Sequence, residues 1–181
     1  MRLRTWQADK KYADQFKPQL ALIFQECKGF ADVVEWAGDD EDRHGIDLIG
    51  ETFGCRCACR VRGYYALCRF RDVTVRWKRP TGASTEWDKL PDHVVDWYLW
   101  AWEEYGVIKA WVFCDVDKMI SEGIFQNPDR WRQVINADGT KGLAIPLSWL
   151  SAHGCIIKAS GVARFIPKGN VDVYQPALIL R

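Results

Sequence analysis

The chain has 181 residues, of which 48% are hydrophobic, 13% aromatic and 27% charged, and its formal net charge is +1. This length favours one domain with a sizeable core, and the composition argues against a disordered chain and against a generally basic nucleic-acid coat. No apolar run approaches the roughly 20 residues that a membrane-spanning helix needs, and the first ten residues lack a signal-peptide core, so a soluble, cytoplasmic protein is expected.

The first part of the chain predicts one helix followed by strands. Residues 11–28 carry apolar side chains at helical spacing, and Pro18 inside this stretch marks a kink or a new first turn. Short strands are predicted over 31–36 and 46–50, and longer ones over 55–62 and 66–78, the last because it is rich in β-branched and aromatic residues.

The strand over residues 55–62 separates two kinds of side chain. Because successive residues point to opposite faces, Cys55, Cys57, Cys59 and Val61 share one face, and the other face carries Arg56, Ala58, Arg60 and Arg62. The chain has seven cysteines, an odd number, and none has the spacing of a structural zinc site. We therefore expect reduced cysteines packed as core residues, and no cofactor.

The second part of the chain opens with a helix start. Thr85 and Asp88 match a capping box, and Pro91 fits the first turn of a longer helix that runs through Tyr105. The strongest strand pattern covers residues 107–116. The remaining predictions are short helices over 117–123 and 148–153, strands over 131–135 and 142–146, and a late hairpin of 155–159 and 162–166.

Aromatic residues crowd the predicted helix that ends at Tyr105. Trp97 and Trp100 would share one of its faces, whereas Tyr98 and Trp102 would lie toward another. A helix that is apolar on two faces is buried on both, or it presents one face to a partner such as a second copy of the chain.

The predicted order is helix, three antiparallel strands, helix and strand, with Asp47 opening one strand of a hairpin and Arg60 and Arg62 on the next. This layout resembles the PD-(D/E)xK, or restriction-endonuclease-like, nuclease fold. The resemblance implies an α/β sandwich with a central mixed β-sheet flanked by helices. It covers roughly residues 11–116, and residues 117–181 would be a C-terminal elaboration of a single domain spanning 1–181.

In that family a helix carboxylate, the hairpin Asp and the Glu of Glu-x-Lys hold Mg²⁺, and the Lys helps to orient the attacking water. The resemblance places Glu26 and Asp47 at the first two positions, as catalytic residues and metal ligands, with Arg60 where the Glu belongs and Arg62 where the Lys belongs. Arginine stays protonated and cannot ligate a cation. At most two carboxylates remain, unless Glu51 joins them.

Three interpretations of this candidate site stay open. Asp47 could pair with Arg60 or Arg62 across the hairpin and stabilise it. A residual Mg²⁺-dependent nuclease could persist, or the arginines could line an anion pocket on an inactive scaffold.

Charge is strongly segregated along the chain. Residues 32–51 hold eight carboxylates and one arginine, a net charge of −7, and residues 56–79 hold eight cations and one aspartate, a net charge of +7. The basic block could follow a phosphate backbone, or it could pair internally with the acidic block. The acidic block could also imitate the charge of a nucleic acid. The candidate nucleic-acid or anion ligands are Arg56, Arg60, Arg62, Arg69, Arg71, Arg76 and Lys78.

These patterns favour a nucleic-acid-binding protein on a catalytically degenerate PD-(D/E)xK scaffold, with DNA or a nucleoprotein complex as its partner. Residues 79–86 are similar to a segment of phage proteins of this fold. The arginines at positions 60 and 62, together with the charge blocks, motivate the hypothesis of an anti-defence role, such as an anti-CRISPR protein or another inhibitor of a host nucleic-acid-targeting system. The alternatives are an active Mg²⁺-dependent endonuclease and an inhibitor that binds protein without nucleic-acid contact.

Overall fold

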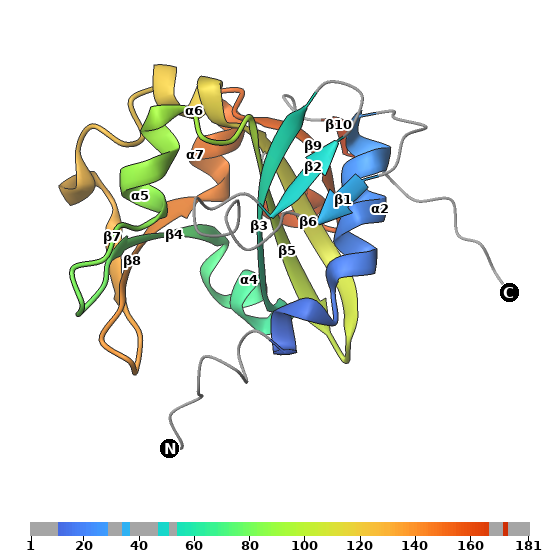
Figure 1. Ribbon diagram of the computed structural model, residues 1–181, viewed down its shortest axis with the longest axis horizontal. Helices are drawn as coiled ribbons and strands as arrows, with labels where there is room; N and C mark the ends of the chain where they lie inside the picture. Colours follow the sequence, from blue (N-terminus) through green and yellow to red (C-terminus); the bar gives the residue numbers. More distant parts are fainter. Residues whose placement is uncertain (1–10, 29–33, 37–46, 51–53, 167–171, 174–181) are drawn as a thin grey trace, which may run out of the picture.

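The computed structural model describes residues 11–28, 34–36, 47–50, 54–166 and 172–173. It is an α/β arrangement with a larger mixed sheet, a smaller antiparallel sheet and helices around them (Figure 1). Among these residues, none of the helices is long and apolar enough to cross a membrane.

The larger sheet has the strand order β1-β2-β3-β5-β6-β9-β10. Strands β3 and β5 are parallel, as are β9 and β10, and the other neighbours are antiparallel. Its strands are β1 (Val34–Trp36), β2 (Leu48–Gly50), β3 (Cys55–Gly63), β5 (Trp97–Glu104), β6 (Val107–Asp115), β9 (Ile156–Ser160) and β10 (Asp172–Val173).

The smaller sheet has the order β4-β8-β7 and is antiparallel. Its strands are β4 (Asp72–Lys78), β7 (Arg132–Ile135) and β8 (Lys141–Pro146). The α-helices are α2 (Lys17–Lys28), α4 (Tyr64–Phe70), α5 (Glu86–Lys89), α6 (Val116–Ser121) and α7 (Leu147–Ala152). Single 3₁₀ turns are η1 (Leu90–Asp92), η2 (Pro128–Arg130) and η3 (Ala163–Phe165).

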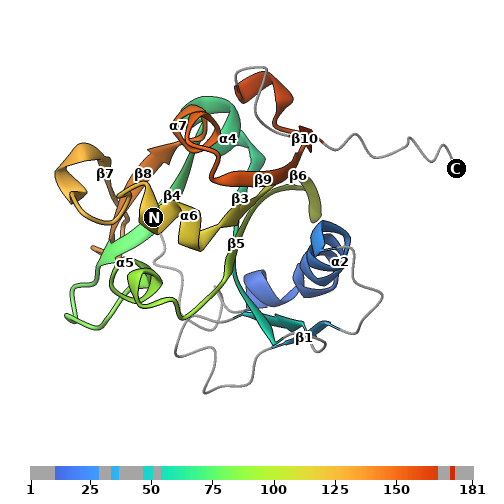
Figure 2. The ribbon, with the colours of Figure 1, turned by 90° about the horizontal axis from the view of Figure 1, so that it is seen from above.

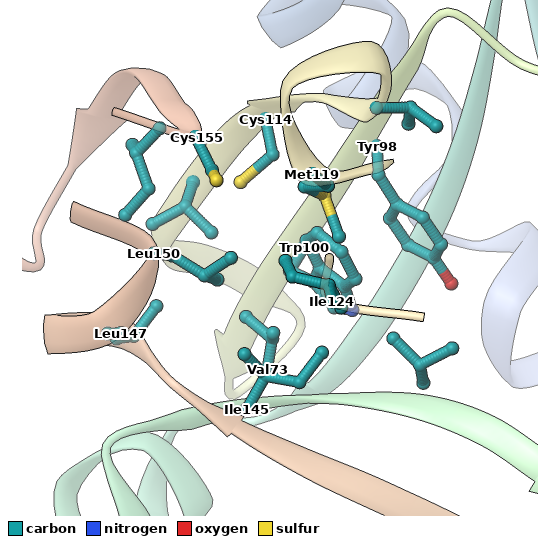
Figure 3. Packing of buried hydrophobic residues seen from close by; sticks show 14 of the residues in the cluster. Val73, Tyr98, Trp100, Cys114, Met119, Ile124, Ile145, Leu147, Leu150 and Cys155 are labelled. Carbon is teal, nitrogen blue, oxygen red and sulfur yellow. The ribbon is translucent and has the colours of Figure 1, made fainter. Parts of the chain in front are cut away.

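The larger sheet is covered on both faces. Helix α2 packs on one face, where Phe16, Leu20 and Phe24 meet Cys57 and Phe113. Helices α4 to α7 and the smaller sheet lie on the other side (Figure 2). There Tyr98 and Trp100 of β5 stack with ring centroids 3.7 Å apart, and they pack with residues of the smaller sheet such as Val73 and Ile145 (Figure 3).

The predicted alternation of faces along β3 is confirmed. Cys55, Cys57 and Cys59 all pack in the cluster beneath α2, whereas Ala58 belongs to the cluster on the opposite face. The thiols therefore act as small apolar groups of the core, and burial is the main reason that the pKa of Cys59 is raised.

The prediction of a long helix through Tyr105 is wrong, because residues 97–104 form strand β5. Both faces of β5 are buried, so its apolar residues run continuously and hide the period of two that marks a half-exposed strand. The predicted capping box at Thr85 is confirmed, but α5 is only four residues long. Pro91 then lies in η1, and His93 ends that turn in the left-handed conformation with φ 54°.

The strand predicted over residues 66–78 is also wrong in its first half. Residues 64–70 form α4, Arg71 caps it with φ 54°, and β4 begins only at Asp72. The late hairpin is wrong in its second half, because residues 163–165 form η3, and β9 pairs instead with β6 and β10.

Other predictions are confirmed by the structure. Pro18 lies in the first turn of α2, after an earlier helical turn at residues 11–14. The strand predicted over 107–116 is β6, the pair around the 136–139 turn is β7 and β8, and the two short helices are α6 and α7.

Candidate functional site

Asp47 lies just before β2 and is fixed to β3 by two hydrogen bonds. Its backbone N–H donates to the carbonyl of Cys57 over 2.9 Å, and its carboxylate accepts the N–H of Cys59 over 2.6 Å. Leu48 points toward α2, so the alternation of the strand turns Asp47 to the opposite face. There its charge helps to raise the pKa of Arg60.

Glu26 lies on the α2 side of the sheet. Its carboxylate is 4.0 Å from the ammonium of Lys158, which also donates to the carbonyl oxygen of Glu26 over 3.1 Å. Lys158 is in register with Phe113, a residue of the cluster beneath α2. The sheet therefore separates Glu26 from Asp47, and the structure does not bring the two predicted metal ligands together.

A metal centre finds little support elsewhere in the described part of the chain. No group of three or more His, Cys, Asp or Glu side chains there is arranged to hold a metal ion. Glu51, the third carboxylate considered from the sequence, lies outside the described residues, as does most of the acidic block.

Arg60 lies between the two sheets and pairs with Glu86 of α5. Its guanidinium also donates to the carbonyl of Thr74 over 3.1 Å, and Glu86 accepts the backbone N–H of Arg76 over 2.9 Å. The two paired side chains are only 18% and 19% exposed. Burial alone would lower the pKa of Arg60, but the carboxylate of Glu86, followed by Tyr98 and Asp47, raises it above its ordinary value.

Two more arginines share this setting. Arg62 is 3.2 Å from a carboxylate oxygen of Asp72, whose side chain is 4% exposed and which also pairs with Arg132 of β7. For Arg76, burial and then the nearby charge of Arg60 lower the pKa, while Glu86 opposes this effect. We refer to Arg60, Arg62 and Arg76 as the interior arginines, because the two sheets hold their charges beside Glu86 and Asp72.

Arg56 and Lys78 lie away from the interior arginines. The backbone N–H of Arg56 donates to Asp96 over 2.7 Å, and its guanidinium donates to the carbonyl of His93 over 3.0 Å. Arg56 lines an open cavity of about 430 Å³ together with Asp96, Asp115 and Asp117. Lys78 is exposed at the end of β4, with its ammonium 4.2 Å from the centre of the Trp77 ring.

Arg69 and Arg71 are exposed on α4. This helix buries Ala66 and Leu67, and Arg71 closes it by donating its N–H to the carbonyl of Leu67. The rest of the helix surface therefore faces outward, including Tyr65, which is 70% exposed, and Phe70, which is 40% exposed.

Phe70 is flanked by two guanidinium groups. The Cζ atom of Arg69 lies 5.1 Å from the centre of its ring, and that of Arg132 lies 5.2 Å from it. Such distances are those of cation–π contacts, which hold a guanidinium against the ring face. Arg132 thus connects the surface of α4 to the buried carboxylate of Asp72.

A second pair of guanidinium groups surrounds Phe165 of η3. Arg164 lies 4.7 Å from its ring centre and Arg71 lies 6.0 Å from it. Arg164 also donates to the hydroxyl of Tyr64 over 2.9 Å, which fixes η3 against α4. We call this group the α4 surface; it comprises Tyr64, Tyr65, Arg69, Phe70, Arg71, Arg132, Arg164 and Phe165.

The sequence predicted part of this surface. Arg69 and Arg71 were expected as anion ligands, whereas Arg132 and Arg164 lie far along the chain and were missed. The alternation of aromatic and basic residues in Tyr64, Tyr65, Arg69, Phe70 and Arg71 was a visible signal for it.

No family model, curated protein or solved structure matches the chain.

Proposed function

We propose that this protein binds nucleic acid through the α4 surface. The observation that carries the proposal is the grouping of four guanidinium groups, those of Arg69, Arg71, Arg132 and Arg164, around exposed or half-buried aromatic rings. These groups come from three separate parts of the chain, so the fold rather than local composition gathers them.

Guanidinium groups suit phosphate ligands because they donate two parallel hydrogen bonds and stay charged at any physiological pH. The contacts of Arg164 with the Phe165 ring and with the hydroxyl of Tyr64 reduce the freedom of its side chain before a ligand arrives. The interior arginines differ in this respect. The guanidinium groups of Arg60 and Arg62 pair with Glu86 and Asp72, and Arg76 donates its backbone N–H to Glu86, so we assign these three residues to the stability of the fold. Arg132 also pairs with Asp72, but its side chain is 54% exposed and contacts Phe70.

We further propose that the scaffold is a catalytically degenerate PD-(D/E)xK fold. In support, α2 is followed by the antiparallel strands β1, β2 and β3, then by helices α4 and α5, and then by β5 beside β3. In this proposal β4 is an addition between β3 and β5, and the other two strands of its small sheet, β7 and β8, follow β6 in the chain. The endonuclease alternative has less support because Glu26 and Asp47 lie on opposite faces of the sheet.

Salt-dependent binding tests the proposed function. The protein is titrated into a labelled 20-nucleotide DNA and fluorescence anisotropy is recorded at several salt concentrations. For the double variant Arg69→Gln/Arg164→Gln we expect affinity at low salt to fall by roughly 10- to 100-fold, because two phosphate contacts are lost. The slope of log K against log salt should decrease by about 1.5 to 2.

The matched control is Lys78→Gln/Arg79→Gln, which removes the same charge at the other end of β4. Strand β4 has seven residues, so its two ends lie roughly 20 Å apart. We expect its affinity to stay within about twofold of the native value. Equal losses in the two variants would show that overall charge, and not the α4 surface, drives binding. If the native protein bound no nucleic acid at low salt, the proposal would be wrong.

A further inference from the structure

Two aromatic rings on α4 are exposed without an evident role in folding. The Tyr65 ring lies on the outside of the helix at 70% exposure, and Phe70 keeps 40% of its surface exposed at the end of the same helix. By contrast, Tyr98, Trp100 and Trp102 of β5 are buried, although Tyr105, in the turn after β5, is 94% exposed. Exposed aromatic surface beside guanidinium groups is what a ligand with flat, apolar faces requires.

We infer that the α4 surface takes single-stranded nucleic acid, with unpaired bases stacked on Tyr65 and Phe70 while Arg69 and Arg132 bind the adjacent phosphates. This inference rests on the proposed function and narrows its ligand class. In a duplex the bases are already stacked on one another, so their faces cannot reach side chains at the surface. A single strand offers unpaired base faces and phosphate groups at the same time.

The spacing along α4 supports this assignment. Tyr65 and Arg69 are four residues apart, so they lie on the same side of the helix one turn from each other. Phe70 follows directly, between the guanidinium groups of Arg69 and Arg132. A base and its own phosphate can therefore be bound within one short segment of surface.

The contacts of Phe70 also indicate what changes on binding. Before the ligand arrives, Arg69 and Arg132 cover part of the ring. A charge-assisted hydrogen bond to phosphate is stronger than a cation–π contact at an exposed site. Phosphate oxygens thus draw the guanidinium group of Arg69 away, and the ring face that it leaves becomes free to stack on a base. Arg132 stays paired with the carboxylate of Asp72 and reaches the phosphate from there.

The test uses four probes of equal length: a 12-nucleotide thymine DNA, the corresponding uracil RNA, a 12-base-pair duplex, and an abasic sugar–phosphate strand. We expect the two base-bearing single strands to bind at least tenfold more tightly than the abasic strand and the duplex. Tyr65→Leu and Phe70→Leu should each weaken binding to the single strands by roughly 5- to 100-fold, because one stacked base is lost.

The same leucine variants should leave the salt dependence of binding and affinity for the abasic strand unchanged, since no charge is removed. In the native protein, a 5-iodouracil strand should photo-crosslink to Tyr65, as mapped by mass spectrometry. This measurement does not depend on whether the Phe70→Leu variant folds fully. Equal or tighter binding of the duplex or of the abasic strand would overturn the inference while the proposed function stands. If none of the four probes binds, both fail together.

Discussion

The interior arginines and two arginines of the α4 surface, Arg69 and Arg71, are close in sequence but have opposite surroundings. Arg60, Arg62 and Arg76 lie between two sheets with Glu86 and Asp72 beside them. Arg69 and Arg71 are exposed, and the partners shown for them are aromatic rings.

The difference follows from the cost of desolvation. A guanidinium group taken out of water needs a counter-charge and several hydrogen-bond acceptors, and this demand uses up its capacity to bind a ligand. A guanidinium group held against a ring at the surface keeps its hydration and its charge. The comparison therefore predicts that substitutions in the first group change stability and those in the second group change binding.

The largest effect is expected for Glu86→Ala. The carboxylate of Glu86 pairs with Arg60 and accepts the N–H of Arg76, so its removal leaves a largely buried guanidinium without its partner. We expect the free energy of unfolding to fall by about 2 to 3 kcal/mol, since both side chains retain some exposure. Urea denaturation followed by tryptophan fluorescence measures this change.

Glu104→Ala is the control, because it removes an exposed carboxylate at the end of β5 and should change stability by less than about 0.5 kcal/mol. Replacing the pair together, as Arg60→Met/Glu86→Leu, should restore much of the loss because no unpaired charge remains. A loss below about 1 kcal/mol for Glu86→Ala would remove the distinction between the two groups of arginines.

Arg62 and Arg132 allow a sharper comparison, since both pair with the same carboxylate of Asp72. Arg62 is 21% exposed and Arg132 is 54% exposed and contacts Phe70. We expect Arg62→Ala to lower the free energy of unfolding by about 1 to 2 kcal/mol with unchanged nucleic-acid affinity.

Arg132→Ala should cost less than about 1 kcal/mol of stability, because solvent screens an exposed ion pair. It should weaken binding roughly tenfold at low salt, as one phosphate contact is lost. Urea denaturation and anisotropy titrations on the same samples give both quantities. The opposite pattern, with Arg62→Ala weakening binding more than Arg132→Ala, would place the ligand between the sheets.

The sequence predicted those elements whose pattern depends on their own residues. The strand β6 has Gly106 before it and an apolar run, and the capping box of Thr85 and Asp88 is a local feature that the fold retains. The prediction for residues 97–104 was wrong because a helix and a buried strand would both place the tryptophans in a core. Only the parallel pairing of β5 with β3, 34 or more residues earlier in the chain, decides between them.

The site was predicted to a similar extent. The period of two along β3 correctly placed Arg60 and Arg62 on one face. It could not indicate that β4 would cover that face, because residues 66–71 were assigned to a strand and not to α4. Arg132 and Arg164 reach α4 only through tertiary contacts across the β4-β8-β7 sheet and η3.

The smallest effect is expected for Arg56→Ala. Arg56 was predicted from the sequence as a nucleic-acid ligand, but it lies six residues before Arg62 on β3, roughly 20 Å from the α4 end of that strand. Its ion pair with Asp96 is about 40% exposed, so its loss should change the free energy of unfolding by less than about 0.5 kcal/mol. Anisotropy titration should show native affinity for single-stranded DNA, because this end of the sheet carries Asp96, Asp115 and Asp117 rather than further cations. If Arg56→Ala instead weakened binding as much as Arg69→Gln does, the nucleic acid would have to extend along the whole length of β3, and the assignment of ligand contacts to the α4 surface alone would be too narrow.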